Sequence, residues 1–158
     1  SGLAARGQLV YADLGCASCH TQQVRRPDFG SDKARGWGER QSVARDYIHQ
    51  ARPQIGASRL GPDLTNLASR QKSEEALFEL LRDGSARHPA YNFLFETRDV
   101  AGEASPRAVK VAGAPGRETV PTERARALVA YLLSLNTAYD YPEAKHFVPV
   151  AKPAEAKK

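Results

Sequence analysis

Methionine is absent from this chain of 158 residues, which also has only two cysteines and one tryptophan. Two neighbouring cysteines cannot form the disulfide framework of a small secreted domain. No segment approaches the roughly 18 consecutive apolar residues that a membrane-spanning helix needs. The net charge is +5, but the arginines are scattered and no basic stripe interleaved with aromatic residues points to nucleic-acid binding. The length of 158 residues favours one compact domain.

The two ends of the chain suggest where this domain begins and ends. No signal peptide is visible, and the sequence opens at Ser1-Gly2-Leu3 without an initiating methionine. We therefore expect that an export signal or a membrane anchor has been removed. Proline and lysine recur at the other end. We predict a domain over residues 1–139 and an extended or disordered tail over residues 140–158.

Apolar spacing and capping residues predict a mostly helical domain. A first helix over residues 3–14 ends at Gly15, and a second helix is opened by Ser73 and ended by Gly84. The last helix follows Thr122 and carries one apolar stripe. We also predict a short helix over residues 42–50, an extended loop over residues 84–96, and a small hairpin pairing residues 108–111 with 118–120.

The segment Cys16-Ala17-Ser18-Cys19-His20 carries the chemistry. Two thiols three positions apart can reach the two vinyl groups at one edge of a porphyrin, and the adjacent imidazole then lies under the iron. We therefore predict one covalent haem c, attached at Cys16 and Cys19 and ligated by His20. A zinc site would need four ligands, and the chain has no second cysteine pair. A thioredoxin-like motif would need a βαβ context, whereas the preceding segment is predicted to be helical.

The residues around this motif resemble a known family. Gly7, Tyr11 and a C-terminal helix bearing Tyr131 are similar to class I c-type cytochromes, whose first and last helices cross at a small residue and an aromatic one. A closer resemblance, to the mono-haem cytochrome c subunit of cbb-type haem–copper oxidases, lies in the runs Gly15–Arg25, Gly61–Leu64, Pro89–Glu96 and Ala127–Leu132. It implies a class I cytochrome c fold around one covalent haem. It also implies a periplasmic domain, anchored by one membrane helix in the full-length protein.

The resemblance further implies roles for single residues. The carbonyl of Pro62 would accept the Nδ1 proton of His20, which turns Nε2 toward the iron; an ordinary Gly-Pro turn explains the same residues. The family places a methionine ligand directly before its Pro-x-Tyr segment, where this chain has His88. We therefore expect His20/His88 coordination of the iron, with Tyr91 beside the cofactor.

Other ligands compete with His88 for the second axial position. His49 falls in the short predicted helix, where a surface or packing role is ordinary. His146 lies in the predicted tail, where holding the iron would cost ordering entropy. An open or water-ligated iron is the third alternative.

Haem propionates need hydrogen-bond donors, which arginine and tryptophan supply. The candidates are Arg25, Trp37 and Arg59, followed by Arg26, Arg35 and Arg45. The alternative for each of them is a solvated position in a basic loop.

These features predict an electron-transfer protein and not an enzyme. The haem would relay single electrons between redox protein partners, to or within a membrane-bound respiratory oxidase or reductase. A haem enzyme or gas sensor with a labile distal ligand is an alternative, and rapid carbon monoxide binding would favour it. A subunit whose haem is mainly structural is another, and the absence of reversible reduction would favour that.

Overall fold

The computed structural model describes residues 2–109, 115–137 and 139–145. These residues form four α-helices and one two-stranded antiparallel sheet. The bounds are α1 Gly2–Asp13, α2 Leu67–Arg70, α3 Glu74–Asp83, β1 Phe95–Asp99, β2 Arg117–Pro121 and α4 Glu123–Leu132. Single 3-10 turns lie at Cys16–Ser18, Ala44–Tyr47, Asn92–Leu94 and Pro142–Ala144. The predicted mostly helical domain with a small hairpin is confirmed.

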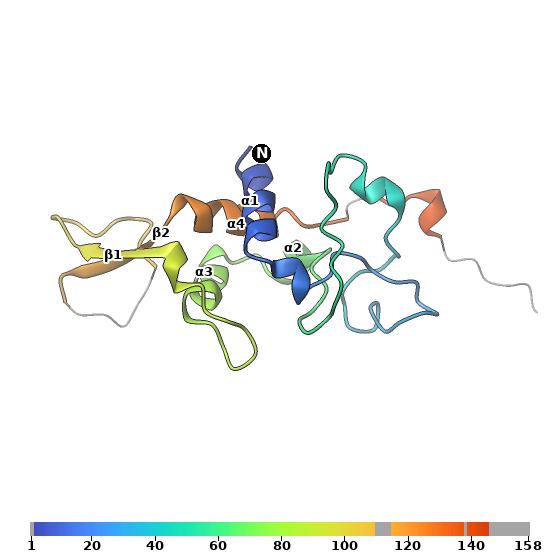
Figure 1. Cartoon of the computed structure of the whole chain (residues 1–158), viewed down its shortest axis with the longest axis horizontal. Helices are drawn as coiled ribbons and strands as arrows, with labels where there is room; N and C mark the ends of the chain where they lie inside the picture. Colours follow the sequence, from blue (N-terminus) through green and yellow to red (C-terminus); the bar gives the residue numbers. More distant parts are fainter. Residues whose placement is uncertain (1, 110–114, 138, 146–158) are drawn as a thin grey trace, which may run out of the picture.

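The helices lie between the β-hairpin at one end of the molecule and irregular loops at the other (Figure 1). Figure 1 shows the β1–β2 hairpin projecting at one end and the loops that follow the cysteine motif at the other, with α1 and α4 crossing between them. The buried core follows that crossing. It consists mainly of Val10, Tyr11, Leu64, Leu77, Leu81, Leu94, Leu128, Val129, Tyr131 and Leu132.

The crossing of α1 and α4 depends on Gly7. A Cβ atom on Gly7 would lie 1.9 Å from the carbonyl oxygen of Ala127 and 2.6 Å from the Cβ of Tyr131. One turn further along α1, Tyr11 packs edge-on against Tyr131, with ring centroids 5.5 Å apart. The predicted crossing at a small residue and an aromatic one is therefore present, and it places the C-terminal end of α1 in the core.

Capping residues set the ends of the other two main helices as predicted. The Ser73 hydroxyl accepts the Ala76 N–H at 3.1 Å, and the chain leaves α3 at Gly84 with φ at +67°. Thr122 likewise accepts the Ala125 N–H at 3.3 Å, and the apolar stripe of α4 is buried. These two helices close the core beneath α1.

Three predicted elements differ from the structure. The predicted extended loop over residues 84–96 ends in the 3-10 turn Asn92–Leu94 and the first residues of β1. The segment after Ser42 forms only a 3-10 turn, because the Asp46 carboxylate accepts the Val43 N–H and binds Arg40, which draws the chain into a tight loop. The strand β2 does contain residues 118–120, but it pairs with β1. The predicted partner of β2 contributes one bridge, Val109 to Thr119, and residues 110 and 111 lie outside the described residues.

The first residues of the predicted tail pack on the body of the molecule. Arg40 donates from Nε to the carbonyl of Tyr139 at 2.7 Å, and its guanidinium lies 5.2 Å from the ring centroid of Tyr141. Arg45 lies over the same ring at 5.1 Å, and Ala144 is buried. The remainder of the tail, from residue 146, lies outside the described residues.

Replacement of Gly7 by valine should destabilise the domain by about 2–3 kcal/mol, because its side chain meets the backbone of α4 and not a flexible side chain. Urea unfolding followed by circular dichroism measures the loss. Gly2→Ala is the matched control, since a Cβ on Gly2 would meet no atom within 4 Å. Equal stability of the two variants would contradict the close helix contact.

Candidate haem site

The cysteine motif begins where α1 ends. Gly15 has φ at +69°, a left-handed conformation that stops the helix, and a 3-10 turn over Cys16–Ser18 follows. The N–H of His20 then donates to the carbonyl of Cys16 at 3.0 Å, so the imidazole lies directly after the turn. Burial raises the pKa of the Cys16 thiol to about 11, which keeps this thiol protonated at neutral pH.

His20 is held from the opposite side by the Gly61-Pro62 turn. Its Nδ1 lies 2.8 Å from the carbonyl oxygen of Pro62, which leaves Nε2 free to bind another group. Only glycine fits before that proline, because a Cβ on Gly61 would lie 2.2 Å from Cε1 of the His20 ring. The structure thus brings together the two residues that the sequence analysis paired.

His88 approaches the His20 ring from the loop after α3. The two ring centroids are 6.2 Å apart and the ring planes are inclined by 45°. The Nδ1 of His88 is buried and has no hydrogen-bond partner, unlike that of His20. Burial and the neighbouring His20 lower the pKa of His88, which favours the neutral ring that a metal ion requires.

The spacing of the two imidazoles fits an iron atom between them. A metal ion bound to both rings by bonds of about 2 Å would place their centroids roughly 6 Å apart. Within residues 2–109, 115–137 and 139–145, no three His, Cys, Asp or Glu side chains are placed to hold a bare metal ion.

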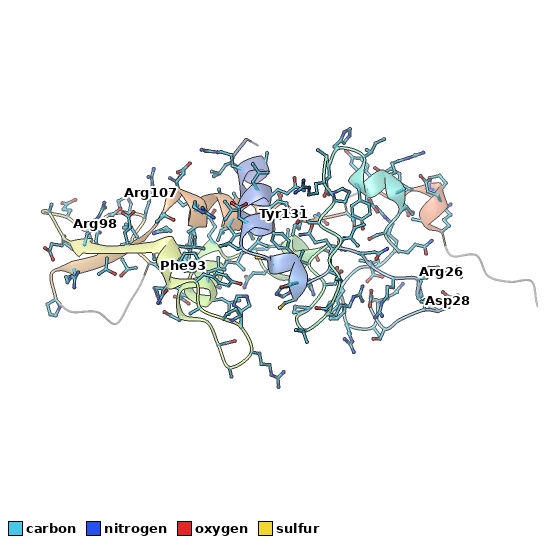
Figure 2. The ribbon with its side chains drawn as sticks, in the orientation of Figure 1. Arg26, Asp28, Phe93, Arg98, Arg107 and Tyr131 are labelled. Atoms are coloured by element: carbon cyan, nitrogen blue, oxygen red, sulfur yellow. The ribbon has the colours of Figure 1, made fainter. Side chains whose placement is uncertain are left out.

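Tyr91 and Phe93 extend this site away from His88. The ring centroid of Tyr91 lies 5.9 Å from that of His88 and 5.9 Å from that of Phe93. Burial, and the nearby thiols of Cys16 and Cys19, raise the pKa of Tyr91, so this residue shares the site with the cysteine motif. In Figure 2, Phe93 lies where the hairpin meets α3, and Tyr131 lies at the centre of the crossing helices.

Arg25 and Arg59 share a buried acidic partner. The Asp32 carboxylate, which is fully buried, accepts from Arg25 Nη2 at 2.8 Å and from Arg59 Nη1 at 2.6 Å. Trp37 lies against the Arg59 guanidinium, with 5.5 Å between the guanidinium carbon and the ring centroid. These three propionate candidates therefore form one cluster around Asp32, a residue that the sequence analysis missed.

Of the remaining candidates, Arg26 and Arg45 lie outside this cluster, and Arg35 adjoins it through Trp37. Arg26 pairs with Asp28 at 2.7 Å, Arg45 pairs with Glu143 at 3.1 Å, and Arg35 stacks on Trp37. His49 is exposed, and His146 lies outside the described residues. The only signal for Asp32 in the sequence is an acid within an arginine-rich stretch, which does not distinguish it from Asp28.

Comparison with known proteins decides the family. The family model described as cytochrome c oxidase, mono-haem subunit/FixO, matches residues 1–114. The chain belongs to this family. A search of curated proteins found no significant match.

Membership of the FixO family confirms the resemblance found in the sequence. It implies that the chain carries one haem and is an electron-transfer subunit of a cytochrome c oxidase complex in a membrane. Among the residues that the structure describes, no helix is long and apolar enough to cross a membrane.

The Asp32 cluster predicts a specific pH dependence of stability. Burial opposes ionisation of Asp32, but hydrogen bonds from Arg25 and Arg59 outweigh it and lower the pKa from 3.8 to about 2. A carboxylate whose pKa falls on folding stabilises the protein above its unfolded pKa, and this contribution is lost as the pH falls from about 4 to about 2.

Urea unfolding between pH 5 and pH 2.5 tests this dependence. We expect Asp32→Asn to be less stable than the wild type at pH 5 and to lose less stability on acidification. Asp28→Asn is the control, because the Arg26–Asp28 pair is half-exposed and should retain the wild-type slope. Parallel curves for the wild type and Asp32→Asn would show that the ionisation of Asp32 is not linked to folding.

Proposed function

We propose that residues 1–139 form a class I cytochrome c module that binds one haem c covalently through Cys16 and Cys19. In this proposal His20 and His88 are the axial ligands of the iron. The observation that carries the proposal is the pair of imidazoles 6.2 Å apart beside the Cys-x-x-Cys-His turn, in a chain of the mono-haem family. The module would pass single electrons within the oxidase complex, on the periplasmic side of an anchoring membrane.

Apolar side chains near both ligands support a large flat cofactor. Leu60, which precedes the turn against His20, is 84 % exposed, and Phe93 beside Tyr91 is 65 % exposed. Exposed side chains of this size are costly in water, and a porphyrin packed against them would recover that burial.

The residues of the site set the properties of a haem bound there. When bound, haem iron takes up one electron as it passes from the ferric to the ferrous state and releases it on reoxidation. The bond from His20 to Pro62 orients the ring and raises the basicity of the nitrogen that faces the iron. A second imidazole at His88 favours the ferric state, so the midpoint potential should lie below that of relatives with a methionine ligand.

We assign the propionate side of the haem to the Asp32 cluster. Arg25 and Arg59 offer guanidinium donors. Both guanidinium groups donate to the Asp32 carboxylate, which fixes their positions. The stacking of Arg59 on Trp37 adds a second constraint on the same side chain. Donors held in place in this way lose little side-chain entropy when they bind a carboxylate.

Covalent attachment is the first test of this function. Holoprotein should keep its haem through denaturation and acid–acetone extraction, because thioether bonds survive both. Intact mass spectrometry should show the polypeptide plus one haem. Cys16→Ala or Cys19→Ala should weaken the attachment, and the double variant should abolish it. A mass equal to that of the bare polypeptide would exclude a c-type haem.

The distal ligand is tested by replacing His88. The wild type should be low-spin in both oxidation states, and His88→Ala should give high-spin ferric iron and fast carbon monoxide binding when reduced. His88→Met should restore six-coordination and raise the midpoint potential.

His49→Ala is the matched control, because His49 is exposed and should leave the absorption spectrum unchanged. His146→Ala tests the remaining histidine alternative. A His88→Ala variant that stays low-spin, together with a changed spectrum in either control, would move the ligand to another histidine.

A further inference from the structure

Two segments of chain face each other across the His20–Pro62 hydrogen bond, and the side chain of Asp63 joins them. Its Oδ2 accepts the Thr21 hydroxyl at 2.6 Å and the Gln23 N–H at 2.8 Å. Its Oδ1 accepts the Thr65 N–H at 2.9 Å. Asp63 is fully buried, so water does not compete for these donors.

Backbone hydrogen bonds place this carboxylate directly beside the imidazole contact. Gly61 N–H donates to the Cys19 carbonyl at 2.9 Å, and Leu64 N–H donates to the Thr21 carbonyl at 2.8 Å. Thr21 comes directly after His20 in the first segment, and Asp63 comes directly after Pro62 in the second. The two side-chain contacts, His20 with Pro62 and Thr21 with Asp63, are consecutive steps between the same two segments.

Arginines complete the surroundings of Asp63. Arg59 Nη2 lies 3.9 Å from its Oδ2, and the Arg70 guanidinium donates to its backbone carbonyl. Since Arg59 also binds Asp32, the turn that contacts His20 is linked to the cluster that we assign to the propionates. Thr21 and Gln23 thus hold the turn through the Asp63 side chain, and Arg70 holds it through the Asp63 backbone carbonyl.

We propose that Asp63 is a positioning residue for the axial ligand His20. It keeps the Pro62 carbonyl at the distance and angle that hold the His20 Nδ1 proton, and so sets the orientation and basicity of the nitrogen that faces the iron. This role rests on the proposed function, in which His20 binds the haem iron. Asp63 itself touches neither the iron nor the imidazole.

An amide at position 63 cannot make the same contacts. Three donors point at the two oxygens of Asp63, and a carboxylate accepts at both. In Asp63→Asn one oxygen becomes an NH₂ group, which faces either the Thr65 N–H or the pair formed by Thr21 and Gln23. In either orientation a donor faces a donor. With the NH₂ toward Thr21 and Gln23 the link between the two segments weakens, and with the NH₂ toward Thr65 the turn that carries Pro62 loses its own bond to the side chain.

Asp46→Asn is the matched control. Asp46 is also a shielded carboxylate that accepts one backbone N–H, from Val43 at 2.9 Å, and pairs with one arginine, Arg40 at 2.7 Å. It lies in the 3-10 turn Ala44–Tyr47, and its own hydrogen bonds come from Val43 and Arg40. A different residue of that turn, Tyr47, donates to the Gln22 carbonyl at 2.8 Å. The control therefore removes the same charge and the same kind of hydrogen bonds at a different place.

The experiment uses haem-loaded full-length protein and two readouts. In Asp63→Asn, exchange of the His20 Nδ1 proton with solvent, followed by NMR in the ferrous state, should accelerate about tenfold or more. The midpoint potential should rise, because the imidazole donates less strongly to ferric iron. Asp46→Asn should leave both at their wild-type values. Thr21→Val, which removes only the hydroxyl donor, should give a smaller acceleration and provides the test if Asp63→Asn yields no holoprotein.

Haem-loaded Asp63→Asn with wild-type exchange and potential would overturn the positioning role while leaving the proposed function intact. Equal changes in Asp46→Asn would also overturn it, since the effect would then come from general destabilisation. An unchanged Thr21→Val would do the same where it is the variant tested. Absence of covalent haem from the wild type would overturn the proposed function, and the role of Asp63 with it.

Discussion

The close contact of α1 with α4 at Gly7 is the constraint on which the rest of this structure depends. The missing side chain lets two backbones meet, and the Tyr11–Tyr131 pair then fills the next turn of the crossing. Because Cys16 lies just beyond the end of α1, the same contact places the cysteine motif against the core. Residues 14–66 contain only two 3-10 turns. The helix contact fixes the position at which this long irregular segment begins.

That irregular segment is organised by buried acids more than by apolar side chains. Asp32 and Asp63 are both fully buried, and each accepts several hydrogen bonds from backbone and side-chain donors. A buried carboxylate is costly unless its partners are complete, so such a residue specifies a loop more narrowly than an apolar contact does. Arg25 and Arg59 are therefore held in fixed positions by buried carboxylates.

The sequence predicted the parts of the fold that depend on neighbouring residues. Caps at Ser73 and Thr122, the stop at Gly15 and the glycine at the helix crossing all act through local geometry or a simple size rule. The strand β1 was missed because its side chains are mostly exposed, and no alternation of apolar and polar residues marks it.

The candidate site also contains residues that the sequence marks and residues that it does not mark. Sequence analysis singled out Cys16, His20, Pro62 and His88, because a spacing or a position in a family motif marks each of them, and the structure brings Pro62 and His88 to His20. The parts played by Asp32 and Asp63 could not be predicted, because their partners are Arg59, Thr21 and Gln23, at separations that no local pattern encodes.

The turn that carries His88 has a consequence for the speed of electron exchange. Ser85 and His88 exchange both of their backbone hydrogen bonds, at 2.8 Å and 3.2 Å, and Tyr91 N–H donates to Leu81 in α3 at 2.6 Å. An imidazole on so short and doubly tied a turn has little freedom to shift. If it binds the iron, as we propose, these backbone bonds would oppose a shift of the ligand when the oxidation state changes. A ligand that moves little would in turn lower the reorganisation energy that limits the rate of electron exchange.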